Sequence, residues 1–256
     1  MYLEDLKDKA VLITGASTGI GATVARAMGR YGARVGVHYR SNRTKAEAVA
    51  SDIRSLGGKA ATFTGDLSRS SHVEALIAEF VAHFGRIDVL INNAGDLVAR
   101  RPLLQLSDAD YDGVLDLNAR SVVIGCQAAI RQFLKQGDGG VIVNTGSIAA
   151  RHGGRAGSLL YAGAKAFVHN FTRGVAKEYA RNGIRVNTVA PGVIATPYHD
   201  RHSSPLHMQE MARNVPMGRV GTPEDCVGAY LFLSSNAMSG YLTGQTIDVN
   251  GGQFMT

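Results

Sequence analysis

Short runs of apolar and β-branched residues alternate along the chain with longer segments that carry an apolar position every three or four residues. The short runs are typical of buried strands, and the longer segments are typical of amphipathic helices. We expect strands at residues 10–14, 34–39, 59–64, 89–92, 141–145, 185–189 and 246–249. We expect helices at residues 19–31, 45–56, 73–84, 108–118, 121–135, 161–182 and 224–233.

This alternation extends over nearly the whole length of the chain and predicts an α/β fold. It indicates one doubly wound parallel sheet of about seven strands, with helices on both faces. Because no repeat, low-complexity tract or linker divides the sequence, residues 1–256 are expected to form a single domain. Residues 195–215 fit the alternation least. We interpret them as a mobile lid over a site or, alternatively, as a surface excursion.

The composition is that of an ordinary globular protein, with 45% hydrophobic and 19% charged residues. The net charge is +6, but the basic residues are spread along the chain, so no nucleic-acid partner is expected. Cys126 and Cys226 lack any metal or redox spacing, so we expect no metal site and core thiols in the cytoplasm; the alternative is a disulfide. No apolar stretch reaches 18 residues and no signal-like start is present, so no membrane partner is expected.

A glycine-rich turn lies between the first strand and the first helix. Glycines let the main chain turn tightly and approach a pyrophosphate, and the helix N-terminus offers free N–H groups. The turn lacks the lysine of an ATP-binding P-loop. It therefore predicts a dinucleotide site in a Rossmann-type fold; the alternative is a turn that serves only the chain reversal. The candidate contacts are Gly15, Ser17, Thr18, Gly19, Ile20 and Gly21.

The residues after the second strand bear on which dinucleotide is bound. A carboxylate is expected about 20 residues past the glycines when the ribose 2′-hydroxyl is free. No acidic residue lies between Arg34 and Ala46. Arg40, Ser41 and Arg43 instead offer donors to a 2′-phosphate, which a carboxylate would repel. The sequence therefore favours NADP(H), with NAD(H) possible; the alternative is that these arginines lie on a solvated loop.

A tyrosine and a lysine start the long predicted helix. Tyr161 and Lys165 are four residues apart, so both side chains face the same way. A cation beside a tyrosine stabilises its phenolate and lowers its pKa, which favours proton transfer at neutral pH. Ser147 follows the fifth strand, where strand ends line a ligand crevice, and its hydroxyl is suited to hold a carbonyl oxygen. Asn118 is either a helix cap or part of this site.

The sequence resembles the short-chain dehydrogenase/reductase family from about Leu6 to Gly252. Its nearest resemblance is to 3-oxoacyl-carrier-protein reductases and bacterial glucose dehydrogenases, whose NADP-accepting loops are similar to residues 37–41. Two departures, Thr145-Gly146 before the serine and an Arg- and Gly-rich stretch at 151–158, leave the proton-transfer residues intact. The matching motifs are Thr14-Gly15-x-x-x-Gly19-Ile20-Gly21, Asp66-Leu67, Asn92-Asn93-Ala94-Gly95, Asn118, Ser147, Tyr161-x-x-x-Lys165 and Pro191-Gly192.

The resemblance implies an NADP-preferring oxidoreductase that moves a hydride between a nicotinamide and a small carbonyl or secondary alcohol substrate. It also implies a homotetramer. The implied catalytic residues are Asn118, Ser147, Tyr161 and Lys165. Beyond the glycine-rich turn, the implied cofactor contacts are Tyr39, Arg40, Ser41, Asp66, Leu67, Asn92, Ala94, Gly95, Tyr161, Lys165, Pro191, Gly192, Ile194 and Thr196.

The resemblance implies a separate role for several of these residues, as follows. Asp66 binds the adenine amino group, and Asn92, Ala94 and Gly95 pack along the adenosine ribose. Ile194 and Thr196 contact the nicotinamide carboxamide or the diphosphate. Ser147 orients the substrate oxygen, and Tyr161 is the acid or base. Lys165 binds the nicotinamide ribose, and Asn118 holds a water that links Lys165 to solvent.

Three other functions compete with this one: a non-catalytic NADP-binding redox sensor, a methyltransferase and a nucleic-acid-binding protein. A sensor does not need Ser147, Tyr161 and Lys165, and a methyltransferase does not need a tyrosine and lysine four residues apart. The substrate itself is not readable from the sequence. Four arginines are either solvated loop residues or contacts for an anionic substrate: Arg100, Arg101, Arg151 and Arg155.

Overall fold

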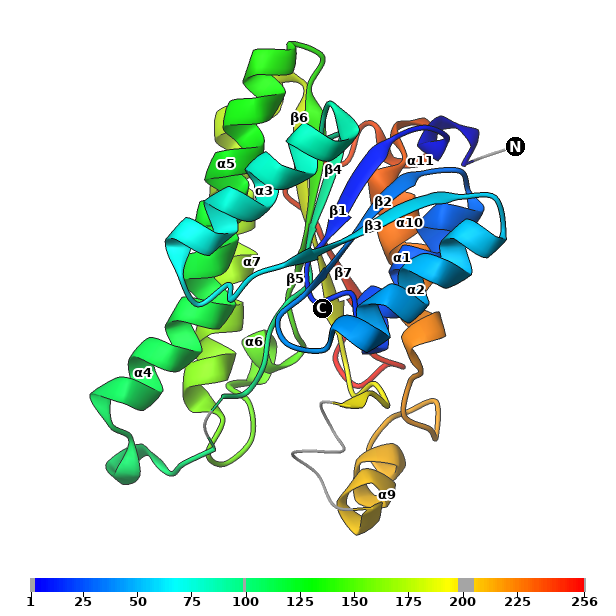
Figure 1. Ribbon diagram of the computed structural model, residues 1–256. Coiled ribbons are helices and arrows are strands. Elements are labelled where there is room, and N and C mark those ends of the chain that lie inside the picture. The colour runs from blue at the N-terminus through cyan, green and yellow to red at the C-terminus, as the bar shows by residue number, and fades with distance from the viewer. Residues whose placement is uncertain (1–2, 99, 198–204, 256) are drawn as a thin grey trace.

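The computed structural model describes residues 3–98, 100–197 and 205–255 (Figure 1). Seven parallel strands form one sheet in the order β3-β2-β1-β4-β5-β6-β7, which confirms the predicted α/β fold. The chain reverses its direction across the sheet between β1 and β4, the place where open sheets bind ligands. The strands are β1 (Ala10–Ile13), β2 (Arg34–Tyr39), β3 (Lys59–Thr64), β4 (Val89–Asn92), β5 (Gly140–Thr145), β6 (Ile184–Pro191) and β7 (Thr246–Val249).

Helices cover both faces of the sheet (Figure 1). Alternate side chains of each strand point to opposite faces: in β1, Val11 and Ile13 join one apolar cluster, and Leu12 joins the other. Helices α1 (Gly19–Arg30), α2 (Arg43–Ser55) and α10 (Pro223–Ser234) pack on the first face. Helices α3 (Ser70–Phe84), α5 (Ser121–Gln136) and α7 (Leu159–Tyr179) pack on the second.

The two helices predicted at 108–118 and 121–135 form one continuous helical segment. Helix α4 (Asp108–Leu115) begins at a capping box in which Ser107 and Asp110 bond each other's backbone N–H groups. It runs into a π-helical turn at Asp116–Arg120 and then into α5. Insertions of this kind inside helices are frequent at functional sites, and this one carries Asn118.

Three short helices were not predicted: α6 (Ala149–His152), α9 (Pro205–Arg213) and α11 (Asn236–Ser239). Helix α9 lies inside the predicted lid and stands apart from the sheet, beyond the carboxyl ends of the strands (Figure 1). Residues 198–204 of that lid lie outside the described residues. Single 3-10 turns occupy Glu4–Leu6, Leu103–Gln105 and Ala180–Asn182.

The described residues include neither a membrane-spanning helix nor a cluster of metal ligands. None of the helices found there combines the length and apolarity that a membrane span needs. The same residues contain no group of three or more His, Cys, Asp or Glu side chains arranged to hold a metal ion. Cys126 and Cys226 are buried free thiols.

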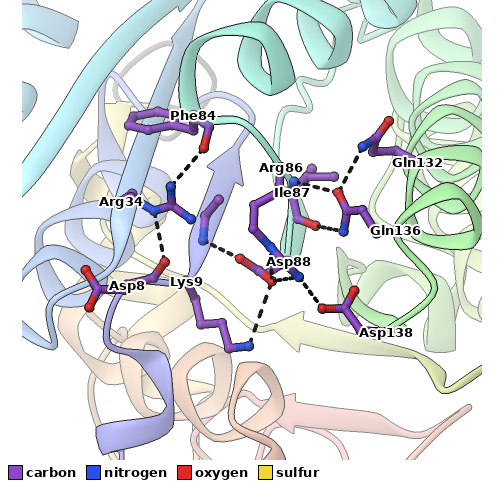
Figure 2. Close-up of polar contacts among 11 residues, drawn as sticks. Asp8, Lys9, Arg34, Phe84, Arg86, Ile87, Asp88, Gln132, Gln136 and Asp138 are labelled. Atoms are coloured by element: carbon purple, nitrogen blue, oxygen red, sulfur yellow. Dashed lines mark hydrogen bonds and ion pairs between the residues drawn. The ribbon is translucent and has the colours of Figure 1, made fainter.

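At the amino-terminal end of the sheet, charged side chains neutralise one another (Figure 2). Asp88 precedes β4 and is 8% exposed. Its Oδ2 accepts from the backbone N–H of Ala10 at 2.7 Å, and its Oδ1 accepts from Arg86 Nε at 2.9 Å. Lys9 Nζ lies 3.8 Å from the same Oδ1, and Arg86 also pairs with Asp138. Asp88 thereby ties the start of β1 to β4.

Candidate active site

A cavity of about 510 Å³ lies at the carboxyl ends of the central strands. Its wall combines the glycine-rich turn, the ends of β2, β4 and β5, the start of α7 and the loop after β6. This is the edge and the switch point where a parallel sheet binds ligands. The predicted site residues that line it are Gly15, Ser17, Thr18, Gly19, Ile20, Tyr39, Arg40, Ser41, Leu67, Ala94, Gly95, Ser147, Tyr161, Lys165, Pro191, Gly192, Ile194 and Thr196.

The glycine-rich turn leaves no room for side chains. Gly15 has a φ of +63°, and a Cβ there would lie 2.9 Å from the Cα of Ala94. A Cβ on Gly21 would lie 2.5 Å from Nδ2 of Asn93, so Gly21 serves packing and does not line the cavity. Thr14 Oγ1 accepts the backbone N–H groups of Asn93 and Ala94 at 2.9 and 3.0 Å. These contacts fix the turn against the end of β4.

His38 holds the same turn from the other side. It is 2% exposed and lines the cavity, although no role was predicted for it. Its Nδ1 accepts from Gly15 N at 3.0 Å, and its Nε2 lies 3.1 Å from Gly65 O. Burial lowers the pKa of His38 to about 4, against the raising effect of its bond to Gly65. The ring is therefore neutral at pH 7 and carries its proton on Nε2.

Basic side chains line the cavity where β2 meets α2. Arg43, one of the predicted phosphate donors, is not among the lining residues, whereas Lys45 is. Asn42 caps α2 by accepting the Lys45 N–H at 3.0 Å. No carboxylate lines this end within the described residues, so a 2′-phosphate would meet only donors and cations. The lining residues here are Tyr39, Arg40, Ser41, Asn42 and Lys45.

Tyr161 and Lys165 lie together on α7, on the face that meets the cavity. The Lys165 Nζ is 5.7 Å from the centre of the Tyr161 ring and donates to Thr145 O at 2.9 Å. Lys165 is 2% exposed, and burial lowers its pKa to about 8. The ammonium is still mainly protonated at pH 7. The Lys165 ammonium and the Tyr161 phenol therefore lie next to each other on the wall of the cavity.

Asn118 lies behind this pair and does not line the cavity. It is fully buried, and its Nδ2 donates to Asp96 O at 2.8 Å and to Val114 O at 2.9 Å. Its Oδ1 accepts from Asp96 N at 3.2 Å. A Cβ on Gly95 would lie 2.9 Å from that Oδ1 and 3.2 Å from Lys165 Nζ. The π-helical turn thus brings Asn118 next to the Lys165 side chain.

Ser147 faces the cavity from the loop after β5. Its Oγ accepts from Ala149 N at 3.1 Å, and its own N–H donates to His169 Nε2 at 3.4 Å. Burial, with nearby cations, lowers the pKa of His169 to about 4, so this ring is a neutral acceptor at pH 7. Tyr161, Lys165 and His169 succeed one another every four residues on α7, and the helix therefore supports both hydroxyl-bearing residues of the site.

Two predicted cofactor contacts are placed elsewhere. Asn92 points into the core, where its Nδ2 donates to Asn144 Oδ1 at 2.9 Å, because alternation along β4 turns Asn93 to the cavity instead. Asp66 does not line the cavity either. Its Oδ1 accepts the N–H and the hydroxyl of Ser68 at 3.1 and 2.8 Å. Because neither side chain lines the cavity, the structure does not support the predicted contacts of Asn92 and Asp66 with the adenosine.

Two of the four arginines that the sequence offered as contacts for an anionic substrate line the cavity. Arg100 and Arg155 line it, whereas Arg101 and Arg151 do not. Met211 of α9 is 2% exposed and lines the cavity too, so the predicted lid contributes to the wall. No local motif marks these positions, because loops distant in sequence bring them together. Further lining residues to which the sequence assigned no role are His38, Lys45, Gly65, Asn93, Asp96, His152, Gly154, Ser158 and Gln253.

Known proteins resemble the chain over nearly its whole length. Residues 15–253 match a family described as enoyl-(acyl carrier protein) reductase. A 3-oxoacyl-[acyl-carrier-protein] reductase of Synechocystis is 38% identical over 250 residues, 98% of each chain. The crystal structure of the NADH-dependent reductase A1-R′ complexed with NAD has a TM-score of 0.88 and 40% identity, covering 99% of this chain and 100% of that one. A short chain dehydrogenase of Burkholderia cenocepacia in complex with NADP has a TM-score of 0.89 and 32% identity, covering 97% and 99%.

Proposed function

Because the chain belongs to the short-chain dehydrogenase/reductase family, we propose that it is an NADP-preferring oxidoreductase with a Ser147, Tyr161 and Lys165 centre. It is an enzyme of the class that acts on CH–OH and C=O groups with a nicotinamide dinucleotide. The observation that carries the finer proposal is the Lys165 ammonium, 5.7 Å from the Tyr161 ring, at a cavity whose other end is a glycine-rich turn.

The cavity fits a nicotinamide dinucleotide. Gly15 has no side chain that would keep a pyrophosphate away from the backbone of the turn. The first N–H groups of α1 would be available to bind that pyrophosphate. Relatives bind NAD in one structure and NADP in another, so the preference rests on this chain's own side chains. Arg40 and Lys45 line the end where a 2′-phosphate would lie, and they support NADP.

Each residue of the centre has a distinct task. A bound nicotinamide supplies or accepts the hydride at its C4. Tyr161 gives a proton to the substrate oxygen during reduction and takes it during oxidation, and Lys165 stabilises the phenolate that results. Ser147 donates a hydrogen bond to the same oxygen as negative charge develops. Asn118 holds the Asp96 loop against Lys165 and acts as a positioning residue.

Helix α9 supports the lid that the sequence predicts, because Met211 reaches the cavity wall. We propose that α9 excludes water from the reacting carbon when substrate is bound. A single domain over residues 1–256, a homotetramer and a cytoplasmic location stay predictions from the sequence.

A spectrophotometric screen at 340 nm tests the proposal. The protein is mixed with NADPH or NADH and a panel of sugars, keto acids, ketones and aldehydes, while cofactor fluorescence reports binding. We expect NADPH oxidation with at least one class of carbonyl and a higher kcat/KM for NADPH than for NADH. Binding of NADPH without consumption over the whole panel would favour the redox sensor instead.

A further inference from the structure

Two arginines that belong neither to the glycine-rich turn nor to the β2–α2 loop line the cavity. Arg100 comes from the loop after β4, and Arg155 comes from the loop before α7. We propose that these two residues recognise an anionic group, a carboxylate or a phosphate, on the carbonyl substrate. This inference rests on the proposed function and specifies the substrate class of the same site.

The two loops form one unit. Arg100 Nη1 donates to Ala156 O at 3.3 Å, and Arg101 N donates to Gly157 O at 3.1 Å. Gly157 has a φ of +77°, and a Cβ there would lie 3.0 Å from Arg100 Cγ. The backbone of one loop therefore supports the arginine of the other.

This unit is connected directly to the proton donor. Ser158 Oγ accepts from Arg155 N at 2.8 Å and donates to Arg155 O at 2.7 Å, which closes the loop just before α7 begins at Leu159. Ser158 is 7% exposed, and Tyr161 follows it by three residues. Arg155 is thus held by the same turn that starts the catalytic helix, and both line one cavity.

Ion pairing distinguishes Arg100 from two other arginines near the cavity. Arg101 lies 3.1 Å from Asp110, and Arg151 lies 3.4 Å from Asp248. Arg100 forms no ion pair in the part of the chain that the structure describes, and its side chain bonds a carbonyl oxygen only. A neutral carbonyl is a weaker partner for a guanidinium than a carboxylate or phosphate oxygen. Arg100 therefore keeps donors for an anion.

The cavity contains little to oppose an anion. Its described lining includes one carboxylate, Asp96, whose Oδ1 accepts the adjacent Leu97 N–H at 2.7 Å. The cations at the β2–α2 end, Arg40 and Lys45, lie where the cofactor phosphate is expected. A second pair of cations, Arg100 and Arg155, attracts a second anion, and this favours a keto acid, a sugar acid or a phosphorylated carbonyl compound.

The anionic group takes no part in the redox step. In reduction the carbonyl carbon gains a hydride from the dihydronicotinamide and its oxygen gains the Tyr161 proton, so a C–H and an O–H bond replace the C=O π bond. The carboxylate or phosphate remains unchanged and is held by the arginines. Its contribution is orientation of the reacting carbon.

Matched substrate pairs test the inference. NADPH oxidation is followed with acetoacetate against ethyl acetoacetate, glucuronate against glucose, and glyceraldehyde 3-phosphate against glyceraldehyde. The variants are Arg100→Gln, Arg155→Gln and the double variant. Arg101→Gln is the control, since it removes the same charge from the adjacent position outside the cavity. The first two pairs report carboxylates, and the third reports phosphate.

We expect the wild type to prefer the anionic member of the carboxylate or the phosphate pairs by at least about tenfold in kcat/KM. The double variant loses this preference and keeps its rate on neutral members, and Arg101→Gln behaves as the wild type. Equal rates on both members, or a preference that survives in the double variant, overturn the inference and leave the proposed function standing. No NADPH oxidation with any member, while other carbonyls of the screen are reduced, also overturns the inference; no oxidation over the whole screen contradicts the proposed function itself.

Discussion

The two ends of the sheet use the same kinds of charged side chain in opposite ways. At the amino-terminal end, Asp88 is satisfied by Arg86, Lys9 and a backbone N–H, and Gln136 bonds both the N–H and the C=O of Ile87 (Figure 2). At the carboxyl end, Tyr161, Lys165 and Arg100 line a cavity. Charges that neutralise each other stabilise the fold, whereas charges directed at a cavity are available to a ligand.

Burial has different consequences at the two ends. Asp88 is a buried carboxylate that contacts a backbone N–H group and two cationic side chains. Lys165 is a buried ammonium that donates to the carbonyl oxygen of Thr145, and burial lowers its pKa to about 8. A perturbed cation beside an open cavity is typical of active sites. We therefore expect substitutions at the carboxyl end to change activity and those at the amino-terminal end to change stability.

The largest effect is expected from Tyr161→Phe, which removes the proton donor and little else. We expect kcat to fall by about 100- to 10,000-fold, the usual range for a positioned acid–base group. NADPH binding, followed by fluorescence, and the urea midpoint should stay close to wild type. If Tyr161→Phe keeps a near-normal kcat, Tyr161 is not the proton donor. The functional difference between the two ends of the sheet would then lose its main support.

The opposite behaviour is expected from Asp88→Ala. This change leaves Arg86 and the Ala10 N–H without their shared acceptor, and we expect the free energy of unfolding in urea to fall by about 3 kcal/mol. Asp138→Ala is the matched control, because Asp138 pairs with the same Arg86 but its side chain is 53% exposed; it should cost less than about 1 kcal/mol. If both variants lose the same free energy of unfolding, the burial of Asp88 does not increase its contribution to stability.

A smaller effect is expected from Arg40→Ala. Loss of a charge-assisted contact to the 2′-phosphate should lower kcat/KM for NADPH by about tenfold or more. The value for NADH should change little, and Arg43→Ala should have little effect on either cofactor, since Arg43 does not line the cavity. If Arg40→Ala weakens both cofactors equally, the phosphate contact is refuted.

The smallest effect concerns pH. His38 has a pKa of about 4 in the fold and an ordinary value of 6.5. Between these values the unfolded chain takes up a proton that the folded chain does not, so stability is present above pH 6.5 and is lost as the pH falls toward 4. Each such histidine contributes a slope of about 1 kcal/mol per pH unit. His38→Asn keeps an acceptor for Gly15 N without titrating, and urea titrations between pH 6 and 5 should show a shallower slope.

An unchanged slope in His38→Asn would mean that the ring does not stay neutral under the glycine-rich turn. His169, which has the same lowered pKa, remains as a second source of acid sensitivity in this variant. The variant should therefore reduce the slope without abolishing it.

Local patterns were sufficient for much of the fold and for part of the site. All seven strands were predicted. Strands at the centre of the sheet, such as β1 and β4, are buried on both faces and are continuous apolar runs or nearly so. The glycine-rich turn and the pair Tyr161 and Lys165 are also local sequence patterns. Residues of both patterns line the cavity.

Contacts between distant segments were not predictable in this way. His38 bonds Gly15 and Gly65, which are 23 and 27 residues away, and Arg100 bonds Ala156 across 56 residues. Helix α9 was interpreted as irregular because proline and polar residues interrupt its pattern. The assignment of Asn92 to the cofactor followed the family motif, whereas alternation along β4 turns that side chain into the core.

Transfer of isotope from cofactor to product tests the central claim most directly. The protein is supplied with NADPH that carries deuterium at C4 and with a carbonyl compound from the screen, and the alcohol is examined by mass spectrometry and NMR. The account predicts deuterium on the carbinol carbon, a slower rate than with unlabelled NADPH, and loss of the reaction in Tyr161→Phe. An alcohol whose carbinol hydrogen comes from water, or one formed equally fast by Tyr161→Phe, would contradict it.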